Sequence, residues 1–249
     1  MNFVYFDKIR KLLDVVEQHE RDTMSQVVEL LTHTILAKRS IFVFGASHAG
    51  IMTEELFYRA GGLMVINPIF ARELMLDTSP VTHTSRMERL PGYGPSILSN
   101  HEISKGDVLI VHSVSGRNPV AIELVMEAKR RGAIIVALTN VAYSKTTTSR
   151  LPSGERLFEV ADVVLDNHGD VGDACVEIKG IEQKVAATST VIGATILNSI
   201  IAETVQQLVN HGVSTAPVFF SANVDGGDEK NQEAYREYQD MMHYDFSWR

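Results

Sequence analysis

The chain has 249 residues, of which 45% are hydrophobic, so it can bury the core of one large domain but not of two. Its 31 Asp and Glu residues outnumber 23 Lys and Arg residues, and the formal net charge of −8 excludes a general nucleic-acid-binding surface, which needs clustered cations. The single cysteine, Cys175, cannot form an intramolecular disulfide, and the charged N-terminus offers neither a signal peptide nor a membrane span. We therefore expect a cytoplasmic protein that binds neither nucleic acid nor membrane.

We expect one domain over residues 1–249, of which the first part, residues 1–39, is helical. Apolar side chains recur there at helical spacing: Met24, Val27, Val28, Leu31 and Ile35. A weaker pattern of the same kind precedes them, so we expect two helices that pack on the domain. Neither has the basic face of a DNA-recognition helix, which argues against a transcription regulator.

Short apolar runs rich in β-forming residues predict buried parallel strands at residues 41–44, 108–111, 134–138 and 163–165, with a further short strand at 63–66. A well-signalled helix separates the second and third of the main runs. Asn118 is its expected N-cap, Pro119 lies in its first turn, and Gly132 follows its end. Strand, helix and strand in this order form a parallel crossover, so the pattern predicts an α/β fold with a three-layer, doubly wound parallel sheet.

Three segments lie outside this alternation. Residues 67–106 are rich in Pro and Gly, and we expect this long excursion to border the functional site. A long final helix is expected from about Glu182 to Asn210. Residues 225–249 contain seven acidic and three basic residues, a local charge of −4, and predict an acidic C-terminal helix or tail.

Two short loops rich in small and hydroxyl residues follow the first two main strands: GASHAG at residues 45–50 and SVSGRN at residues 113–118. At the carboxyl ends of parallel strands, helix N-termini and free amides favour a bound anion. Each loop alone is more simply a Ser-bearing turn that caps its helix, but two in successive positions favour a phosphate site. The nucleoside triphosphate motif is absent because Ile51 and Met52 stand where Lys and a hydroxyl residue are required.

The stretch from 108 to 138 resembles the central signature of the sugar isomerase (SIS) domain family, in which a strand leads into S-x-S-G-x-[TN] and a helix that ends in a basic residue and Gly. Here the signature is SVSGRN at 113–118 and KRRG at 129–132, followed by the next strand. The first loop is similar to the family's G-x-G-x-S pattern, with Val43 in place of the first Gly. The resemblance covers residues 41–210, and the ends are similar to a bacterial phosphosugar-binding branch of the family.

The resemblance implies a flavodoxin-like fold, a homodimer with its sites near the subunit interface, and a phosphorylated sugar as ligand. It implies that the phosphate is bound by Ser47, Ser113, Ser115 and Asn118. Three further residues of the loops complete the expected binding set: Gly45, Gly116 and Arg117. Arg117 adds positive charge to the site, or else it is a solvent-facing side chain in the first turn of its helix.

An aldose–ketose isomerase needs a general base, commonly Glu, and a second group that moves protons between oxygens, often His. The candidate bases are Glu182, expected at the start of the final helix, and Glu88, in the excursion. Each of them could instead be an ordinary surface carboxylate without a catalytic role. His48, beside Ser47, is the candidate second group. The polar run 166–173 is expected to be a solvated loop, so we expect no metal and no cofactor.

The leading interpretation is an enzyme that binds a phosphorylated monosaccharide or amino sugar and isomerises it between aldose and ketose. A sensor that binds the same ligand without turnover is the main alternative, because fold alone does not decide chemistry. An etherase or deaminase that acts on an amino-sugar phosphate is the third interpretation.

Overall fold

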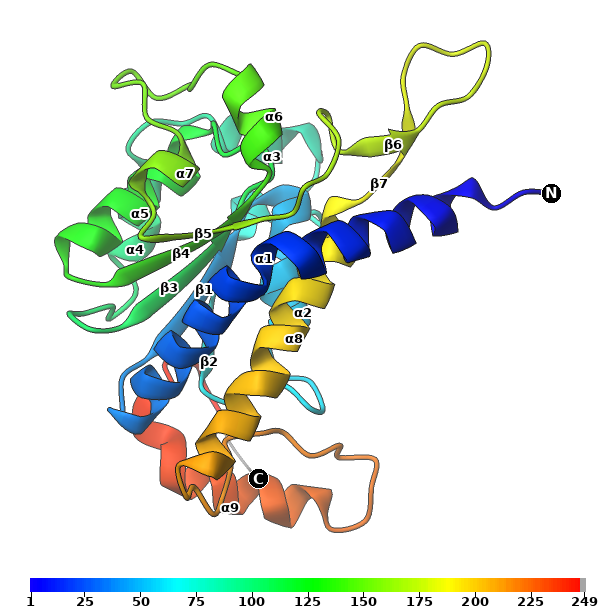
Figure 1. Cartoon of the computed structure of the whole chain (residues 1–249). Coiled ribbons are helices and arrows are strands. Elements are labelled where there is room, and N and C mark those ends of the chain that lie inside the picture. The colour runs from blue at the N-terminus through cyan, green and yellow to red at the C-terminus, as the bar shows by residue number, and fades with distance from the viewer. Residues whose placement is uncertain (247–249) are drawn as a thin grey trace.

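Five parallel strands form the central sheet in the computed structural model, which describes residues 1–246. Their spatial order is β2 (Ile66–Ile69), β1 (Ile41–Gly45), β3 (Val108–His112), β4 (Ile134–Thr139) and β5 (Val163–Asp166) (Figure 1). Chain order reverses between β1 and β3, which creates the switch point of a doubly wound, flavodoxin-like sheet. The predicted fold class is therefore confirmed.

Both faces of the sheet are buried. Along β1, Ile41 and Val43 belong to the core beneath α1 (Val4–Leu36) and α8 (Ser189–Asn210). The alternate residues Phe42 and Phe44 face a second core that includes helices on the other side of the sheet. Strands buried on both faces are continuous apolar runs, which is why the four main runs could be located from sequence.

The edge strand β2 lies three residues beyond its predicted position at 63–66. Ile66 pairs with Ile41, whereas Leu63 forms only an isolated antiparallel bridge with Val218. Pro68, inside the strand, cannot donate a backbone hydrogen bond, but an edge strand tolerates this loss. The Asn67 side chain ties the strand down by donating to the carbonyls of Ile41, Val65 and Met241.

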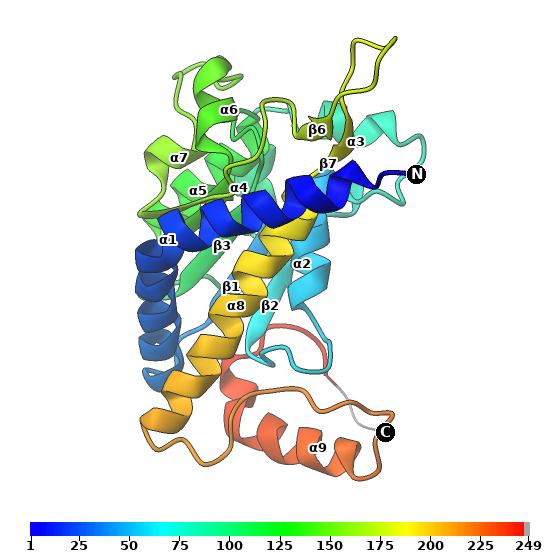
Figure 2. The same ribbon diagram turned by 45° about the vertical axis from the view of Figure 1, so that its right-hand side comes forward.

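One continuous helix, α1 (Val4–Leu36), replaces the two helices expected over residues 1–39. The reason is that the segment contains no Gly or Pro, so nothing interrupts the backbone between its two apolar patterns. Figure 2 shows the helix changing direction along its length, so that its second half runs downward in this view. Ser25 Oγ donates to the Arg21 carbonyl at 2.9 Å, a contact that often bends helices.

The final helix begins at Ser189 rather than near Glu182. Residues 174–187 form an antiparallel hairpin instead, with strands β6 (Ala174–Val176) and β7 (Val185–Ala187). Asp173 fixes the start of α8, because its carboxylate accepts hydrogen bonds from Ser189 N at 2.8 Å and Ser189 Oγ at 2.6 Å. The expected position of Glu182 in the first turn of this helix is therefore wrong.

The remaining helices are short, apart from α5 and α9. They are η1 (Ser47–Gly50), α2 (Ile51–Leu56), η2 (Arg72–Leu74), α3 (Thr82–Met87), α4 (Tyr93–Leu98), α5 (Pro119–Arg130), α6 (Val141–Thr146), α7 (Leu157–Val160), α9 (Gly227–Tyr238) and η3 (Gln239–Met241). Helix α5 matches its predicted bounds, and Gly132 follows it with φ of +90°. Helix α9 is the expected acidic helix; the last three residues of the segment 225–249 lie outside the described residues.

Within residues 1–246, no helix is both long enough and apolar enough to span a membrane.

Candidate functional site

The first loop, residues 45–50, is a tight turn that follows β1. A Cβ atom on Gly45 would lie 2.3 Å from the Ala49 carbonyl oxygen, so the turn closes only with glycine at this position. Ser47 has a positive φ of +52°, which is uncommon for a residue other than glycine. Its hydroxyl donates a short hydrogen bond to a Glu88 carboxylate oxygen. The strained backbone of this loop therefore directs the Ser47 hydroxyl toward the excursion.

The second loop, residues 113–118, is fixed to the end of β4. Thr139 Oγ1 donates to the carbonyl of Ser113 at 2.7 Å, and Asn140 N donates to the carbonyl of Val114 at 3.0 Å. Gly116 has φ of +58° and packs so closely that a Cβ would lie 3.3 Å from Thr139 Oγ1. The hydroxyls of Ser113 and Ser115 have no hydrogen-bond partner within residues 1–246, so both can still form hydrogen bonds to a ligand or to water.

Glu88 connects the two loops. Its carboxylate accepts from Ser47 Oγ in the first loop and from Asn118 Nδ2 in the second, at 2.5 Å for the amide. The Glu88 carbonyl also accepts from Val120 N at 3.3 Å, which holds the end of α3 against the start of α5. The excursion thus borders the two loops, and its Glu88 carboxylate accepts a hydrogen bond from one side chain of each loop.

Arg150 lies next to the second loop. Arg150 Nη1 donates to Asn118 Oδ1 at 2.7 Å, and Arg150 N donates to the Arg117 carbonyl at 2.9 Å. Burial, followed by the charges of Arg89 and Arg117, lowers the pKa of the Arg150 guanidinium, and Glu88 raises it. The charges of Arg89, Arg117 and Glu88 therefore all act on Arg150, so positive charge gathers at this edge of the sheet although the whole chain is acidic.

His112, the last residue of β3, lies behind the second loop and is 1% exposed. Its Nδ1 is 3.1 Å from the Ala49 carbonyl oxygen, and its Nε2 has no hydrogen-bond partner among the described residues. The ring lines a cavity of about 20 Å³, together with Ala46, Glu88, Ser113, Asn118, Val120 and Ala121. Burial lowers the pKa of His112 to about 4, so the ring is neutral at pH 7.

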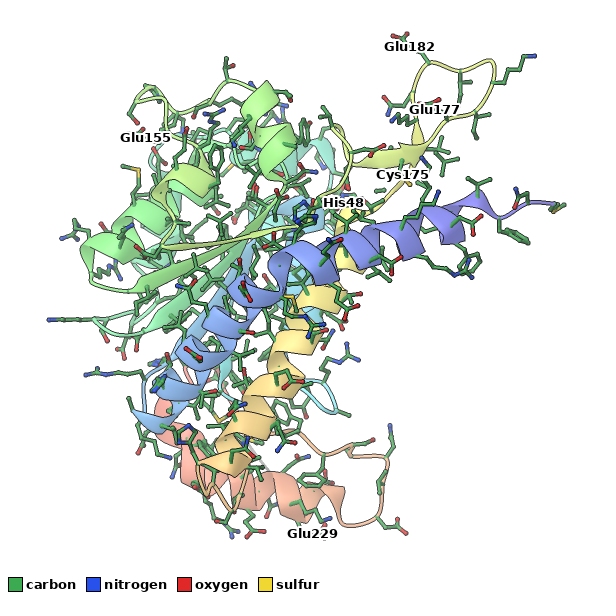
Figure 3. All side chains as sticks on the ribbon, viewed as in Figure 1. His48, Glu155, Cys175, Glu177, Glu182 and Glu229 are labelled. Carbon is green, nitrogen blue, oxygen red and sulfur yellow. The ribbon has the colours of Figure 1, made fainter. Side chains whose placement is uncertain are left out.

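The structure brings together only some of the predicted site residues. The two loops and Glu88 meet at one edge of the sheet, whereas Glu182 lies in the exposed hairpin that projects from the body of the molecule (Figure 3). His48 is exposed within η1, next to Ser47. Sequence reasoning did not select Arg150 or His112, which contribute a cation and an unpaired imidazole to the same place.

The acidic residues of the run 166–173 serve as structural partners. Asp166 Oδ1 accepts from His168 N at 3.0 Å, Asp170 pairs with Lys184 at 2.9 Å, and Asp173 caps α8. In the part of the chain that the structure describes, His, Cys, Asp and Glu do not form a group of three or more that could hold a metal ion.

Comparison with known proteins places this arrangement in context. The family profile described as SIS domain matches residues 4–140. UPF0309 proteins of Shouchella clausii and Oceanobacillus iheyensis are 47% and 45% identical to the chain over 240 residues, with 96% of this chain and 97% of each relative covered. They extend the likeness to nearly the full length of the chain.

Two solved phosphoheptose isomerases have a similar backbone. The enzyme from Francisella tularensis has a TM-score of 0.52 at 16% identity, with 82% of this chain and 95% of that chain covered. The enzyme from Neisseria gonorrhoeae has a TM-score of 0.52 at 17% identity, with 83% and 96% covered. At these identities the likeness concerns the fold, and the five-stranded parallel sheet flanked by helices is its common element.

Proposed function

This chain belongs to the SIS domain family, and we propose that it binds a phosphorylated monosaccharide or amino sugar between the loops 45–50 and 113–118. The observation that carries the proposal is the position of Glu88. Its carboxylate accepts hydrogen bonds from Ser47 and Asn118, and the charges of both Glu88 and Arg117 act on Arg150, which itself donates to Asn118. Donors from both loops therefore already hold an oxyanion inside the protein, and a phosphate group offers the same kind of acceptor.

In the proposed complex the phosphate takes the place of the Glu88 carboxylate on these donors. Ser113 and Ser115 add hydroxyls that the protein itself leaves unpaired, and Arg117 adds charge. Gly45 and Gly116 allow the backbone of each loop to turn tightly enough to present these groups. Charge-assisted hydrogen bonds of this kind are short and strong, so they are suited to fix one end of a small polar ligand.

A thermal-shift and calorimetric panel tests this proposal. We expect stabilisation by at least one of a series of hexose 6-phosphates, amino-sugar 6-phosphates, pentose 5-phosphates and heptose 7-phosphates. The matched control is the corresponding sugar without phosphate, which should not bind measurably, because the proposed anchor is the anion. If no phosphorylated sugar binds at millimolar concentration, the proposal is wrong.

We further propose that the bound sugar is isomerised, with Glu88 as the general base. Once the phosphate occupies Ser47 and Asn118, the Glu88 carboxylate is released and can remove a proton from the carbon next to the carbonyl. This leaves an enediolate. His48 moves the hydroxyl proton from one oxygen to the other, and Glu88 then returns its own proton to the neighbouring carbon. Glu182 has no part in this scheme, because it lies in the hairpin away from the loops.

Proton exchange in heavy water separates an enzyme from a sensor. A binding sugar phosphate that is isomerised acquires deuterium at the carbon next to its carbonyl, which NMR detects directly. A ligand that binds for hours without exchange identifies the sensor alternative and removes the base role of Glu88, while the binding proposal stands.

We also propose that the protein is a cytoplasmic homodimer. A groove of about 1070 Å³ runs between α1 and α8. Apolar side chains of both helices line it: Leu13, Val16, Met24, Val28, Ile196 and Ile200. Thr195 lies in this groove and is exposed, whereas Ala202 is exposed on α8 outside it. Light scattering at micromolar concentration should show a dimer for the unmodified chain and for the control Ala202→Arg. Thr195→Arg, which places a charge in the groove, should be a monomer. A monomeric unmodified chain would contradict the proposal.

A further inference from the structure

His112 is a polar side chain in a place where the fold otherwise puts apolar ones. The other residues of β3, Val108 to Val111, are all buried and apolar, and His112 is equally buried at its end. It pairs in register with Gly45 on β1, at the start of the first loop, and it directly precedes Ser113 in the second loop. The imidazole therefore lies between the two loops that are proposed to hold the phosphate.

The hydrogen bond of His112 fixes its tautomer. The Ala49 carbonyl oxygen is only an acceptor, so Nδ1 carries the hydrogen and donates to it at 3.1 Å. In the neutral ring, Nε2 then bears a lone pair and no hydrogen. Asp173 is near enough to oppose the effect of burial on the pKa of this ring, but burial is the larger cause and keeps the ring neutral.

The lone pair of Nε2 has no partner within residues 1–246. A buried acceptor without a donor is destabilising, so each such atom in a native fold requires an explanation. The ring borders the cavity that Glu88, Ser113 and Asn118 also line. A carboxylate and an unpaired hydroxyl therefore share this cavity with an imidazole that can accept one hydrogen bond.

We propose that His112 is a specificity-determining residue, whose Nε2 accepts a hydrogen bond from a hydroxyl group of the bound sugar phosphate. The inference rests on the binding proposed above and adds the second point of recognition. The loops anchor the phosphate, which every sugar phosphate has, whereas an acceptor at a fixed distance from that anchor selects a hydroxyl at one position of the carbon chain. A site built to pair with a hydroxyl rejects an analogue that lacks it, because the buried acceptor is then left unpaired.

Two substitutions separate the roles of the two ring nitrogens. In His112→Asn, the amide nitrogen can replace Nδ1 as donor to Ala49, but nothing replaces Nε2. In His112→Gln, the longer side chain brings its amide oxygen to the Nε2 position and keeps an acceptor there. Calorimetry measures the affinity of the unmodified chain and both variants for the sugar phosphate that binds best in the panel, for its monodeoxy analogues and for inorganic phosphate.

We expect His112→Asn to lose at least about 10-fold in affinity for the sugar phosphate and less than about twofold for inorganic phosphate, with partial recovery in His112→Gln. To the unmodified chain, one monodeoxy analogue should bind about 10-fold more weakly than the parent sugar phosphate. The same analogue should bind equally well to the unmodified chain and to His112→Asn. Equal losses for sugar phosphate and inorganic phosphate, or no loss in His112→Asn, overturn the inference and leave a structural His or a buried water as the explanation of Nε2. If the unmodified chain binds no sugar phosphate, the proposed function fails first.

Discussion

The loop after β1 and the hairpin between β5 and α8 were both expected to supply residues to one site, and they have opposite physical characters. The first loop is held at its start by β1, which pairs with β3 and β2, and its Ser47 hydroxyl is engaged by Glu88. The hairpin is fully exposed around its tip, where a Cβ atom on Gly180 would meet no atom of residues 1–246 within 4 Å. Its base is held by the Asp173 cap and by Tyr5 Oη, which donates to the Ala187 carbonyl at 2.7 Å.

The difference shows that a residue reaches the site of such a fold through its attachment to a strand end. The two loops follow β1 and β3 directly, so the register of the sheet determines where their side chains lie. The hairpin follows β5 at a distance of several residues and turns back on itself before α8 begins. Matched substitutions in the two regions test this distinction.

The largest expected effect on folding comes from a pair of glycine substitutions. In Gly45→Ala, the new Cβ would lie 2.3 Å from Ala49 O, 2.5 Å from Ala49 C and 2.8 Å from Gly50 N, all backbone atoms. We expect the free energy of unfolding to fall by about 3 kcal/mol or more, with loss of ligand binding. Gly180→Ala in the hairpin meets only backbone strain, because φ is +100°, and should cost about 1–2 kcal/mol. Urea unfolding measures both, and equal losses would contradict the comparison.

The pH dependence of stability should report the burial of His112. Its pKa is lowered from 6.5 to about 4 in the folded chain, so the unfolded chain binds the proton more tightly. The stability associated with the neutral ring is complete above about pH 6.5 and is lost as the pH falls toward 4, by up to about 3 kcal/mol. Urea unfolding between pH 4 and 7 should show a weaker pH dependence for His112→Asn than for the unmodified chain.

The two candidate bases form the next pair. If the ligand is isomerised, Glu88→Gln should reduce turnover by about 100-fold or more, because the amide keeps the shape but cannot accept the proton. Glu182→Gln should leave turnover within about twofold, since Glu182 lies in the exposed hairpin. Single-turnover exchange in heavy water at saturating ligand separates this effect from binding. The opposite result, with Glu182→Gln inactive, would require the hairpin to reach a site on a second copy.

Sequence patterns predicted the fold well where local signals and tertiary structure agree. The four main strands and α5 are found at nearly their expected positions, because strands buried on both faces are continuous apolar runs. The prediction failed where tertiary contacts decide. Pro68 is tolerated inside β2 because β2 is an edge strand. Helix α8 starts at Ser189 because Asp173, which lies sixteen residues earlier in the chain, caps it.

The site was partly predictable for a similar reason. The loops follow identifiable strands, so their place at one edge of the sheet follows from the parallel topology. Glu88 was only one of two candidate bases, because sequence does not show which part of a 40-residue excursion turns inward. His112 could have been selected from sequence, because it is the only polar residue of the otherwise apolar strand Val108–His112 and directly precedes the second loop. Nothing in the local sequence around Arg150 indicates that its side chain reaches Asn118.

The smallest expected effect concerns the individual hydroxyls of the loops. Ser47→Ala and Ser115→Ala should each weaken sugar-phosphate binding by at least about 1 kcal/mol, roughly fivefold, because each removes one hydrogen bond to a charged group. Ser47→Ala also removes a contact to Glu88, which in the free protein competes with the phosphate, so its net effect should be smaller than that of Ser115→Ala. Ser214→Ala, at an exposed position after α8, is the control and should bind normally. Calorimetry of the three variants tests both expectations. If both loop variants kept full affinity, the proposed site would be contradicted. A larger loss in Ser47→Ala than in Ser115→Ala would show that Glu88 does not compete for the phosphate position.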